Sequence, residues 1–165
     1  PCRIFSTGQG FEVGPFRVEP FSVPHDAYEP VGFVVEAVGH RVGVVTDMGM
    51  ATALIRERLR SCRAVVVESN HDEQLVRNAK RPECLKQRIL GRQGHLSNKA
   101  AAALLAEVAG PQLEAVFLAH LSADCNKEDL AWHTVRMGLD KAGHGHVQVL
   151  LTYADRASEV WRPVS

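Results

Sequence analysis

Short runs of β-branched residues recur along the chain, and in its second half they alternate with segments of helical periodicity. Residues 31–47 hold two such runs on either side of Gly39-His40, which predicts a hairpin. Residues 11–23 are interrupted by Gly and Pro and predict two short strands. Strands followed by strands and helices in alternation are typical of one α/β domain. Further strands are expected at residues 64–68, 115–119 and 147–153, and helices at 51–61, 82–90, 98–109 and 127–142.

Details of the helical segments give sharper expectations. In the first helix, Ala53, Leu54 and Leu59 fall near one apolar stripe, with Arg and Glu opposite. Ser97 is expected to cap the helix that begins at residue 98. Gly143 is expected to close the helix that precedes it.

Composition limits the class of protein. The 165 residues suffice for one domain, and no apolar run approaches the roughly 20 residues of a membrane helix. Basic and acidic residues number 19 each, so no global basic field marks the chain as a nucleic-acid binder. Four cysteines without a C-x-x-C pair fit a reducing cytoplasm, where we expect the protein. Because the chain begins with Pro1 rather than Met, we expect it to be the later part of a longer protein.

Imidazole and carboxylate groups follow several of the expected strands. His25, Asp47, Glu68, His71 and His120 all lie at or just beyond the end of an apolar run. Ligands bind at such strand ends in α/β architectures, and these donors suit a borderline divalent ion such as zinc. Taken singly, each histidine is more often a capped or hydrogen-bonded surface residue than a metal ligand. The shared position at strand ends favours a metal site.

Five motifs occur in an order that resembles a known family. They are SVPHDAYEPVGF (22–33), VGVVTDMG (42–49), VVVESNHD (65–72), LKQRILGRQGHLSNKAAAALLAE (85–107) and VFLAHLSADCN (116–126). Together they resemble metallo-β-lactamase-fold hydrolases of the WalJ/YycJ-like branch. The resemblance implies an αββα sandwich within the α/β class, and this chain would be mainly its C-terminal half.

The resemblance also implies a site and an activity. It makes His25 and His120 ligands of two divalent ions, zinc or manganese, with Asp47 bridging them, and makes His95 a non-ligand histidine at the scissile phosphate. The activity implied is 5′-to-3′ exonuclease action on DNA. Candidate substrate contacts are Asn70, His71, Lys86, Arg88, Ser97 and Asn98.

One signature of the family is missing. Nothing in the chain matches the H-x-H-x-D-H loop, which supplies most metal ligands and the water-orienting aspartate. His144 and His146 have the H-x-H spacing but no Asp-His follows, so we interpret them as a loop-to-strand junction. We therefore expect residues 1–165 to be one domain truncated at its N-terminus, with an incomplete metal site and no hydrolase activity of its own.

A local excess of positive charge bears on the substrate. Six Lys or Arg and a single acid, Glu83, lie between Arg77 and Arg92. Such a run either neutralises a phosphodiester backbone or is a solvated helix face. Two alternatives to a nuclease stay open: a small-molecule hydrolase of the thioester, lactone or lactam type, and a non-catalytic half-domain with an interaction role. A half-sandwich would expose apolar sheet surface, so a homo-oligomer is also possible.

Overall fold

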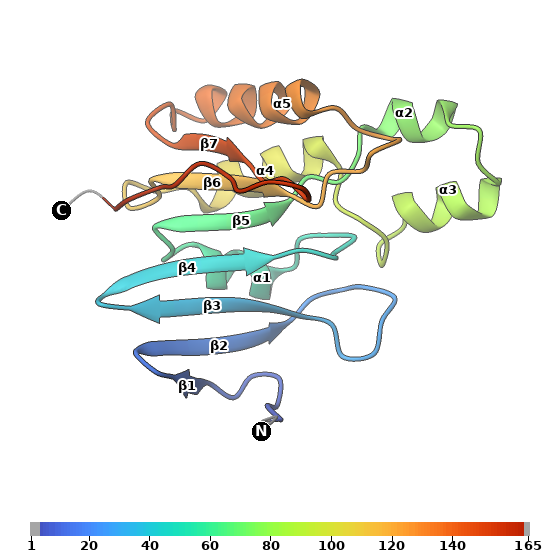
Figure 1. Cartoon of the computed structure of the whole chain (residues 1–165). Coiled ribbons are helices and arrows are strands. Elements are labelled where there is room, and N and C mark those ends of the chain that lie inside the picture. Colours follow the sequence, from blue (N-terminus) through green and yellow to red (C-terminus); the bar gives the residue numbers. More distant parts are fainter. Residues whose placement is uncertain (1–3, 164–165) are drawn as a thin grey trace.

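The computed structural model describes residues 4–163, and its strands form one seven-stranded sheet in sequence order (Figure 1). Strands β1 to β4 pair antiparallel, whereas β4 to β7 pair parallel. As a result β2, β4, β5 and β6 run in the same direction and end at the same edge of the sheet. The strands are β1 (Phe11–Val13), β2 (Phe16–Ser22), β3 (Val31–Ala37), β4 (His40–Val45), β5 (Ala64–Glu68), β6 (Ala115–Ala119) and β7 (Gln148–Leu151).

Of the five helices in the described part of the chain, three cover one face of this sheet, and the other two lie beyond the edge where the strands end (Figure 1). The helices are α1 (Ala53–Leu59), α2 (Glu73–Asn78), α3 (Glu83–Leu90), α4 (Asn98–Val108) and α5 (Glu128–Lys141). Helices α1, α4 and α5 form the covering layer, and α2 and α3 the outlying pair. None of the helices among residues 4–163 has the length and apolar character that crossing a membrane requires.

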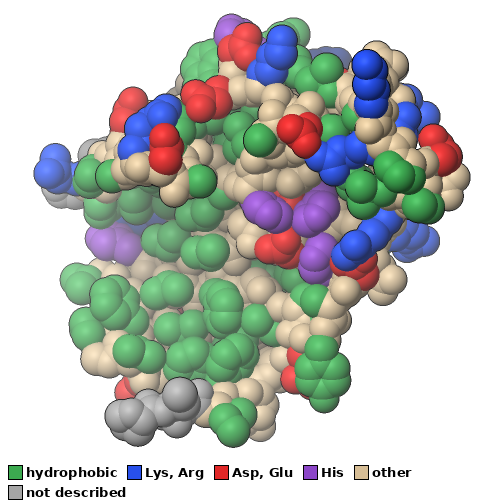
Figure 2. All heavy atoms as spheres, turned by 45° about the vertical axis from the view of Figure 1, so that its right-hand side comes forward, with side chains coloured by type: hydrophobic (Ala, Val, Ile, Leu, Met, Phe, Trp, Pro, Cys, Tyr) green, Lys and Arg blue, Asp and Glu red, His purple; other side chains and the backbone are tan. Residues whose placement is uncertain are grey.

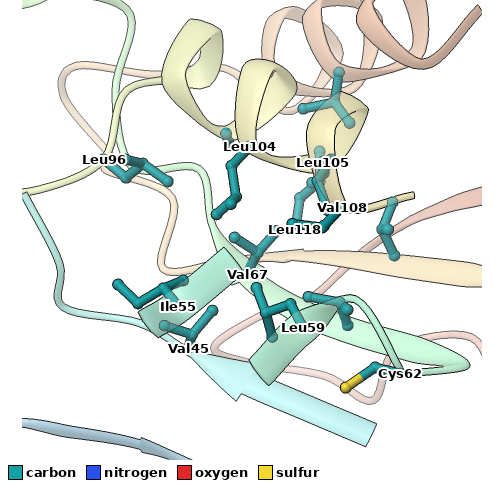
Figure 3. Packing of buried hydrophobic residues seen from close by; sticks show 14 of the residues in the cluster. Val45, Ile55, Leu59, Cys62, Val67, Leu96, Leu104, Leu105, Val108 and Leu118 are labelled. Atoms are coloured by element: carbon teal, nitrogen blue, oxygen red, sulfur yellow. The ribbon is translucent and has the colours of Figure 1, made fainter. Parts of the chain in front are cut away.

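The core lies between the sheet and the covering helices (Figure 3). Val45, Val67 and Leu118 are register partners on β4, β5 and β6, and all three belong to this core. They pack against buried side chains that include Leu59 of α1 and Leu105 of α4. Since strand side chains alternate between faces, the same three strands present their other residues to the opposite face.

No helix among residues 4–163 covers the opposite face. A small cluster there joins Ala64, Ala115 and Leu150, with Phe117 and Trp161 packed against it. Figure 2 shows further hydrophobic side chains gathered on this face. The arrangement is one sheet with helices on one side, which is half of an αββα sandwich, as the sequence motifs predicted.

Capping residues explain where several of the helices begin and end. Ser97 caps α4 by accepting the Ala100 N–H at 3.2 Å, and Gly143 ends α5 with a φ of 84°. The expected stripe of α1 was partly wrong, because Ile55 is buried and Leu54 is exposed. Helix α2 was not predicted, although Asp72 caps it through the N–H groups of Gln74 and Leu75.

Candidate metal centre

Polar side chains from four strand ends meet at one edge of the sheet. His25 follows β2, Asp47 follows β4, Glu68 ends β5 and His120 follows β6. His95, from the loop between α3 and α4, lies among them, and Figure 2 shows histidine side chains gathered here beside acidic and basic ones. The parallel directions of β2, β4, β5 and β6 are what place these residues together.

Glu68 lies at the base of this group and is fully buried. Its Oε2 accepts backbone N–H groups from Met48 at 3.0 Å and Leu96 at 3.2 Å. Its Oε1 lies 2.7 Å from His95 Nδ1 and 2.8 Å from His120 Nδ1. Both carboxylate oxygens are therefore occupied by nitrogen donors, so Glu68 is suited to orient the two imidazoles rather than to bind a ligand itself.

These contacts determine the charge of Glu68 and the tautomers of its partners. Burial by itself raises the pKa of Glu68, but hydrogen bonds from His120, His95 and the Met48 N–H outweigh it and hold the pKa at about 2. An ionised carboxylate only accepts hydrogen bonds, so Nδ1 of each histidine carries the proton. In the neutral tautomer that results, Nε2 of His95 and of His120 is an acceptor. Metal-binding histidines commonly donate their other ring N–H to a carboxylate in this way.

Asp47 contributes a more accessible carboxylate to the same group. Its Oδ1 lies 3.5 Å from His120 Nδ1, 3.8 Å from His25 Nε2 and 3.9 Å from His95 Nδ1. Asp47 and His120 both have left-handed backbones, with φ of 53° and 57°. Such conformations cost free energy in residues other than glycine and concentrate at functional sites.

His25 faces Asp47 from the loop after β2. Its Nδ1 donates to the Gly94 carbonyl at 3.0 Å, which makes Nε2 the acceptor nitrogen in the neutral ring. Nε2 is the atom that lies 3.8 Å from Asp47. The structure therefore brings His25, Asp47 and His120 together, with His95 beside them.

The donor set fits a divalent metal ion. We define the carboxylate–histidine cluster as Asp47, Glu68, His95 and His120, each of which has one donor atom within 4.8 Å of the donors of the other three. Imidazole nitrogen and carboxylate oxygen are ligands that zinc and related ions take in proteins. With His25 at its rim, the cluster offers three histidines and one accessible carboxylate.

A cavity of about 310 Å³ opens beside the cluster. His95 and His120 line it on one side, and Arg81 and Arg88 line it as well. Arg81 pairs with Asp124, and Arg88 Nε lies 2.5 Å from Asp26 Oδ2. The hydrogen bond from Arg88 lowers the pKa of Asp26. Two guanidinium groups thus lie next to the donor atoms, where a negatively charged group would be stabilised.

The candidate substrate contacts separate into different environments. Asn70 lines the 310 Å³ cavity, and its side chain donates to the His120 carbonyl at 2.8 Å. Arg88 lines the same cavity. His71 and Ser97 line a neighbouring cavity of about 330 Å³, and Ser97 also caps α4.

Two of these candidates lie where they cannot easily meet a substrate. Asn98 is 1% exposed and its side chain is hydrogen-bonded to Ser69 and Asn126 inside the fold. Lys86 donates to the Arg77 carbonyl at 2.7 Å and does not line the cavity beside the cluster. Both expectations came from position within a motif, which does not reveal burial.

His144 and His146 lie at the other end of the strands from the carboxylate–histidine cluster. They occupy the loop before β7, and β7 runs parallel to β6. Their loop is therefore at the edge opposite to the one where β6 ends at His120. The interpretation of this pair as a loop-to-strand junction agrees with that position.

Glu68 is the residue of the cluster to which sequence reasoning assigned no role. It was recognised among the strand-end residues, and its position after four apolar residues in AVVVE was a usable signal. A carboxylate that ends an apolar strand must be hydrogen-bonded when it is buried. The partners, His95 and His120, lie 27 and 52 residues away, so only the fold identifies them.

Comparison with known proteins identifies the family. A family model described as "Beta-lactamase superfamily domain" matches residues 1–124, a span that includes all five site residues. The chain belongs to this superfamily and has the metallo-β-lactamase fold. Within the superfamily it is similar to WalJ and YycJ proteins, the branch that the motifs resembled.

The relatives are similar over most of this chain. Exodeoxyribonuclease YycJ of Bacillus anthracis is 35% identical over 142 residues, which are 86% of this chain and 54% of that protein. Exodeoxyribonuclease WalJ of Streptococcus pneumoniae serotype 2 is 30% identical over 143 residues, which are 87% of this chain and 53% of that protein. The chain thus spans about half the length of these curated relatives.

Solved structures show the same fold. The metallo-β-lactamase fold protein YhfI from Bacillus subtilis has a TM-score of 0.68 at 15% identity, covering 95% of this chain and 54% of that chain. Unliganded yeast PDE1 has a TM-score of 0.62 at 14% identity, covering 90% of this chain and 47% of that one.

Proposed function

We propose that the chain is part of a metal-dependent phosphodiesterase, a nuclease that degrades DNA from the 5′ end. The observation that carries the proposal is the 310 Å³ cavity, which Arg81 and Arg88 line together with His95 and His120 of a cluster suited to a metal ion. Guanidinium groups bind phosphate oxygens with two hydrogen bonds. The names of the curated relatives, both exodeoxyribonucleases, support DNA as the substrate.

His25, Asp47 and His120 would hold the metal, with Asp47 shared between two ions of zinc or manganese. A divalent ion held there would polarise a phosphoryl oxygen and lower the pKa of water, and this water would be the nucleophile for hydrolysis. Glu68 holds His120 in the tautomer that this binding needs. The three proposed ligands are fewer than two ions require, so the site in this chain is incomplete.

His95 would act on the leaving group. Its Nδ1 is fixed by Glu68, so Nε2 is the ring atom that can carry a proton toward the cavity or hydrogen-bond a developing oxyanion. Arg81 and Arg88 would hold the phosphate oxygens, and Asn70 would keep the His120 backbone in place.

We further propose that residues 1–165 are a domain truncated at its N-terminus. The sheet face without helices and the half-length match to the relatives support this. Residues upstream would supply the second layer of the sandwich and the H-x-H-x-D-H ligands. Without that layer, a second copy of the chain would associate through the same face. The three cysteines that the structure describes, Cys62, Cys84 and Cys125, are free thiols, which fits the cytoplasm.

The test compares hydrolysis of three substrate types by the complete gene product with added zinc or manganese. The substrates are end-labelled DNA, a thioester and a β-lactam. We expect DNA to be cleaved from its 5′ end, and Arg88→Gln to slow cleavage much more than Lys80→Gln, which removes the same charge from an exposed residue outside the cavity. Cleavage of the thioester or lactam in preference to DNA would overturn the proposal.

A further inference from the structure

A second, larger hollow adjoins the cavity beside the cluster. It measures about 810 Å³ and shares Asp26, Arg88 and Gly94 with the 310 Å³ cavity. The shared residues make the two hollows neighbours along one surface path. We call the larger one the Arg92 groove; Met50, Arg92 and Gln93 also line it. Its volume is in the range of sites that hold small-molecule-sized ligands.

The walls of the Arg92 groove are held in place by hydrogen bonds between loops. The Asp26 N–H donates to the Gln93 carbonyl at 3.1 Å, and the Gly49 N–H donates to the Pro24 carbonyl at 3.0 Å. A Cβ at Gly94 would overlap the Arg88 carbonyl, so the loop packs tightly there. A groove with such walls exists before a ligand arrives, and binding to it needs little ordering.

Charge in the groove favours an anion. Arg88 is paired with Asp26 at the boundary with the cavity. Arg92 is exposed, and no carboxylate among residues 4–163 pairs with it; its Nε lies 3.2 Å from Met50 Sδ. The groove therefore offers a guanidinium without an acidic partner, in contact with an apolar side chain, and such a group suits a phosphate.

We propose that the Arg92 groove holds a single strand of DNA beyond the phosphodiester that is cleaved. Arg92 contacts a backbone phosphate, and Met50 packs against the adjoining nucleoside. The path runs from the cluster past Arg88 to Arg92. This inference rests on the proposed function, since it extends the same substrate away from the metal centre.

Binding without catalysis tests the groove. Fluorescence anisotropy of a labelled oligothymidylate, in EDTA and over a series of salt concentrations, gives the affinity and its salt slope for residues 1–165. Arg92→Gln removes the proposed phosphate contact, and Lys80→Gln is its matched control outside both hollows. Gln93→Lys adds a cation inside the groove, and Gln87→Lys makes the same change at an exposed site of α3 outside it.

We expect Arg92→Gln to weaken binding several-fold and to reduce the salt slope by about 0.7, the value for one phosphate of a single strand. Gln93→Lys should tighten binding and increase the slope by a similar amount, a gain that misfolding cannot produce. Neither control should change the slope. Equal salt slopes for Gln93→Lys and Gln87→Lys would overturn the proposal that the Arg92 groove binds DNA. They would not affect the proposal that the protein is a nuclease. Absence of any DNA binding by the unmodified chain would overturn the groove, and the cleavage assay on the complete gene product would then decide the nuclease separately.

Discussion

Glu68 Oε1 lies between the Nδ1 atoms of His95 and His120, 2.7 Å from the first and 2.8 Å from the second. One buried carboxylate thus sets the orientation and tautomer of a proposed metal ligand and of a proposed catalytic histidine. Its other oxygen is tied to the backbone of Met48 and Leu96. The loops that carry the two histidines are therefore connected to the end of β5.

Glu68→Gln should damage both metal binding and stability. An amide would point N–H groups at donors that already face Glu68, which leaves buried groups unsatisfied and costs about 1–3 kcal/mol of unfolding free energy. Loss of an orienting partner typically lowers metal affinity about 10–100-fold. Urea denaturation and zinc titration measure the two effects. The exposed Glu57→Gln is the control, and equal behaviour of the two variants would contradict the role of Glu68.

The low pKa of Glu68 also predicts a pH dependence of the metal-free chain. Its pKa is about 2 in the folded protein and 4.5 as a free group, so the folded state favours the ionised form. The stabilisation is complete above pH 4.5 and is lost as pH falls from there toward 2. Denaturation in EDTA at several acidic pH values should show a steeper loss for the unmodified chain than for Glu68→Gln. If the unfolding free energy fell equally with pH in both proteins, the link between the ionisation of Glu68 and stability would be contradicted.

His95→Ala should separate catalysis from metal binding. In the complete gene product we expect turnover to fall about 10²–10⁴-fold, as it does when an acid or an oxyanion donor is removed, with metal content unchanged. The exposed His133→Ala, on α5, should leave both unchanged. Loss of metal together with activity would show that His95 is a ligand or a structural residue.

Asn98→Ala should act through stability. Its side chain accepts from Ser69 Oγ at 2.7 Å and donates to Asn126 Oδ1 at 2.8 Å, all of it buried. Removing it deprives the buried Ser69 hydroxyl of its acceptor and Asn126 of two hydrogen bonds, and should cost about 1–3 kcal/mol of unfolding free energy. Lys99→Ala, at the exposed neighbouring position on α4, should cost far less. A thermal or urea transition that is the same for both would contradict the structural role.

Patterns within short segments predicted much of this fold. The strands at residues 64–68 and 115–119 were predicted with the bounds that the structure has, because continuous apolar runs flanked by polar residues are unambiguous. Burial within short helices was harder: Leu54 and Ile55 are adjacent and equally apolar, and only packing against the sheet decides between them. Helix α2 is six residues long and has weak periodicity, so its cap at Asp72 was its one clear signal.

The candidate site was predictable where residue type and strand end coincide, as for His25, Asp47 and His120. It was not predictable where a role depends on burial or on distant partners. Glu68 gains its role from two histidines in other segments, and Asn98 is removed from the surface by packing against Ser69 and Asn126. The basic side chains between Arg77 and Arg92 likewise lie in different places, since Arg81 and Arg88 line the cavity and Lys86 does not.

The central claim is that His25, Asp47 and His120 hold a divalent metal at the end of the parallel strands. Crystals of this chain soaked in zinc, measured at the zinc absorption edge, test it most directly through anomalous difference density. We expect a peak beside Asp47, about 2.0–2.2 Å from its carboxylate and from ring nitrogens of His25 or His120. Peaks only elsewhere, for instance at His144 and His146, or no peak at all, would contradict the account.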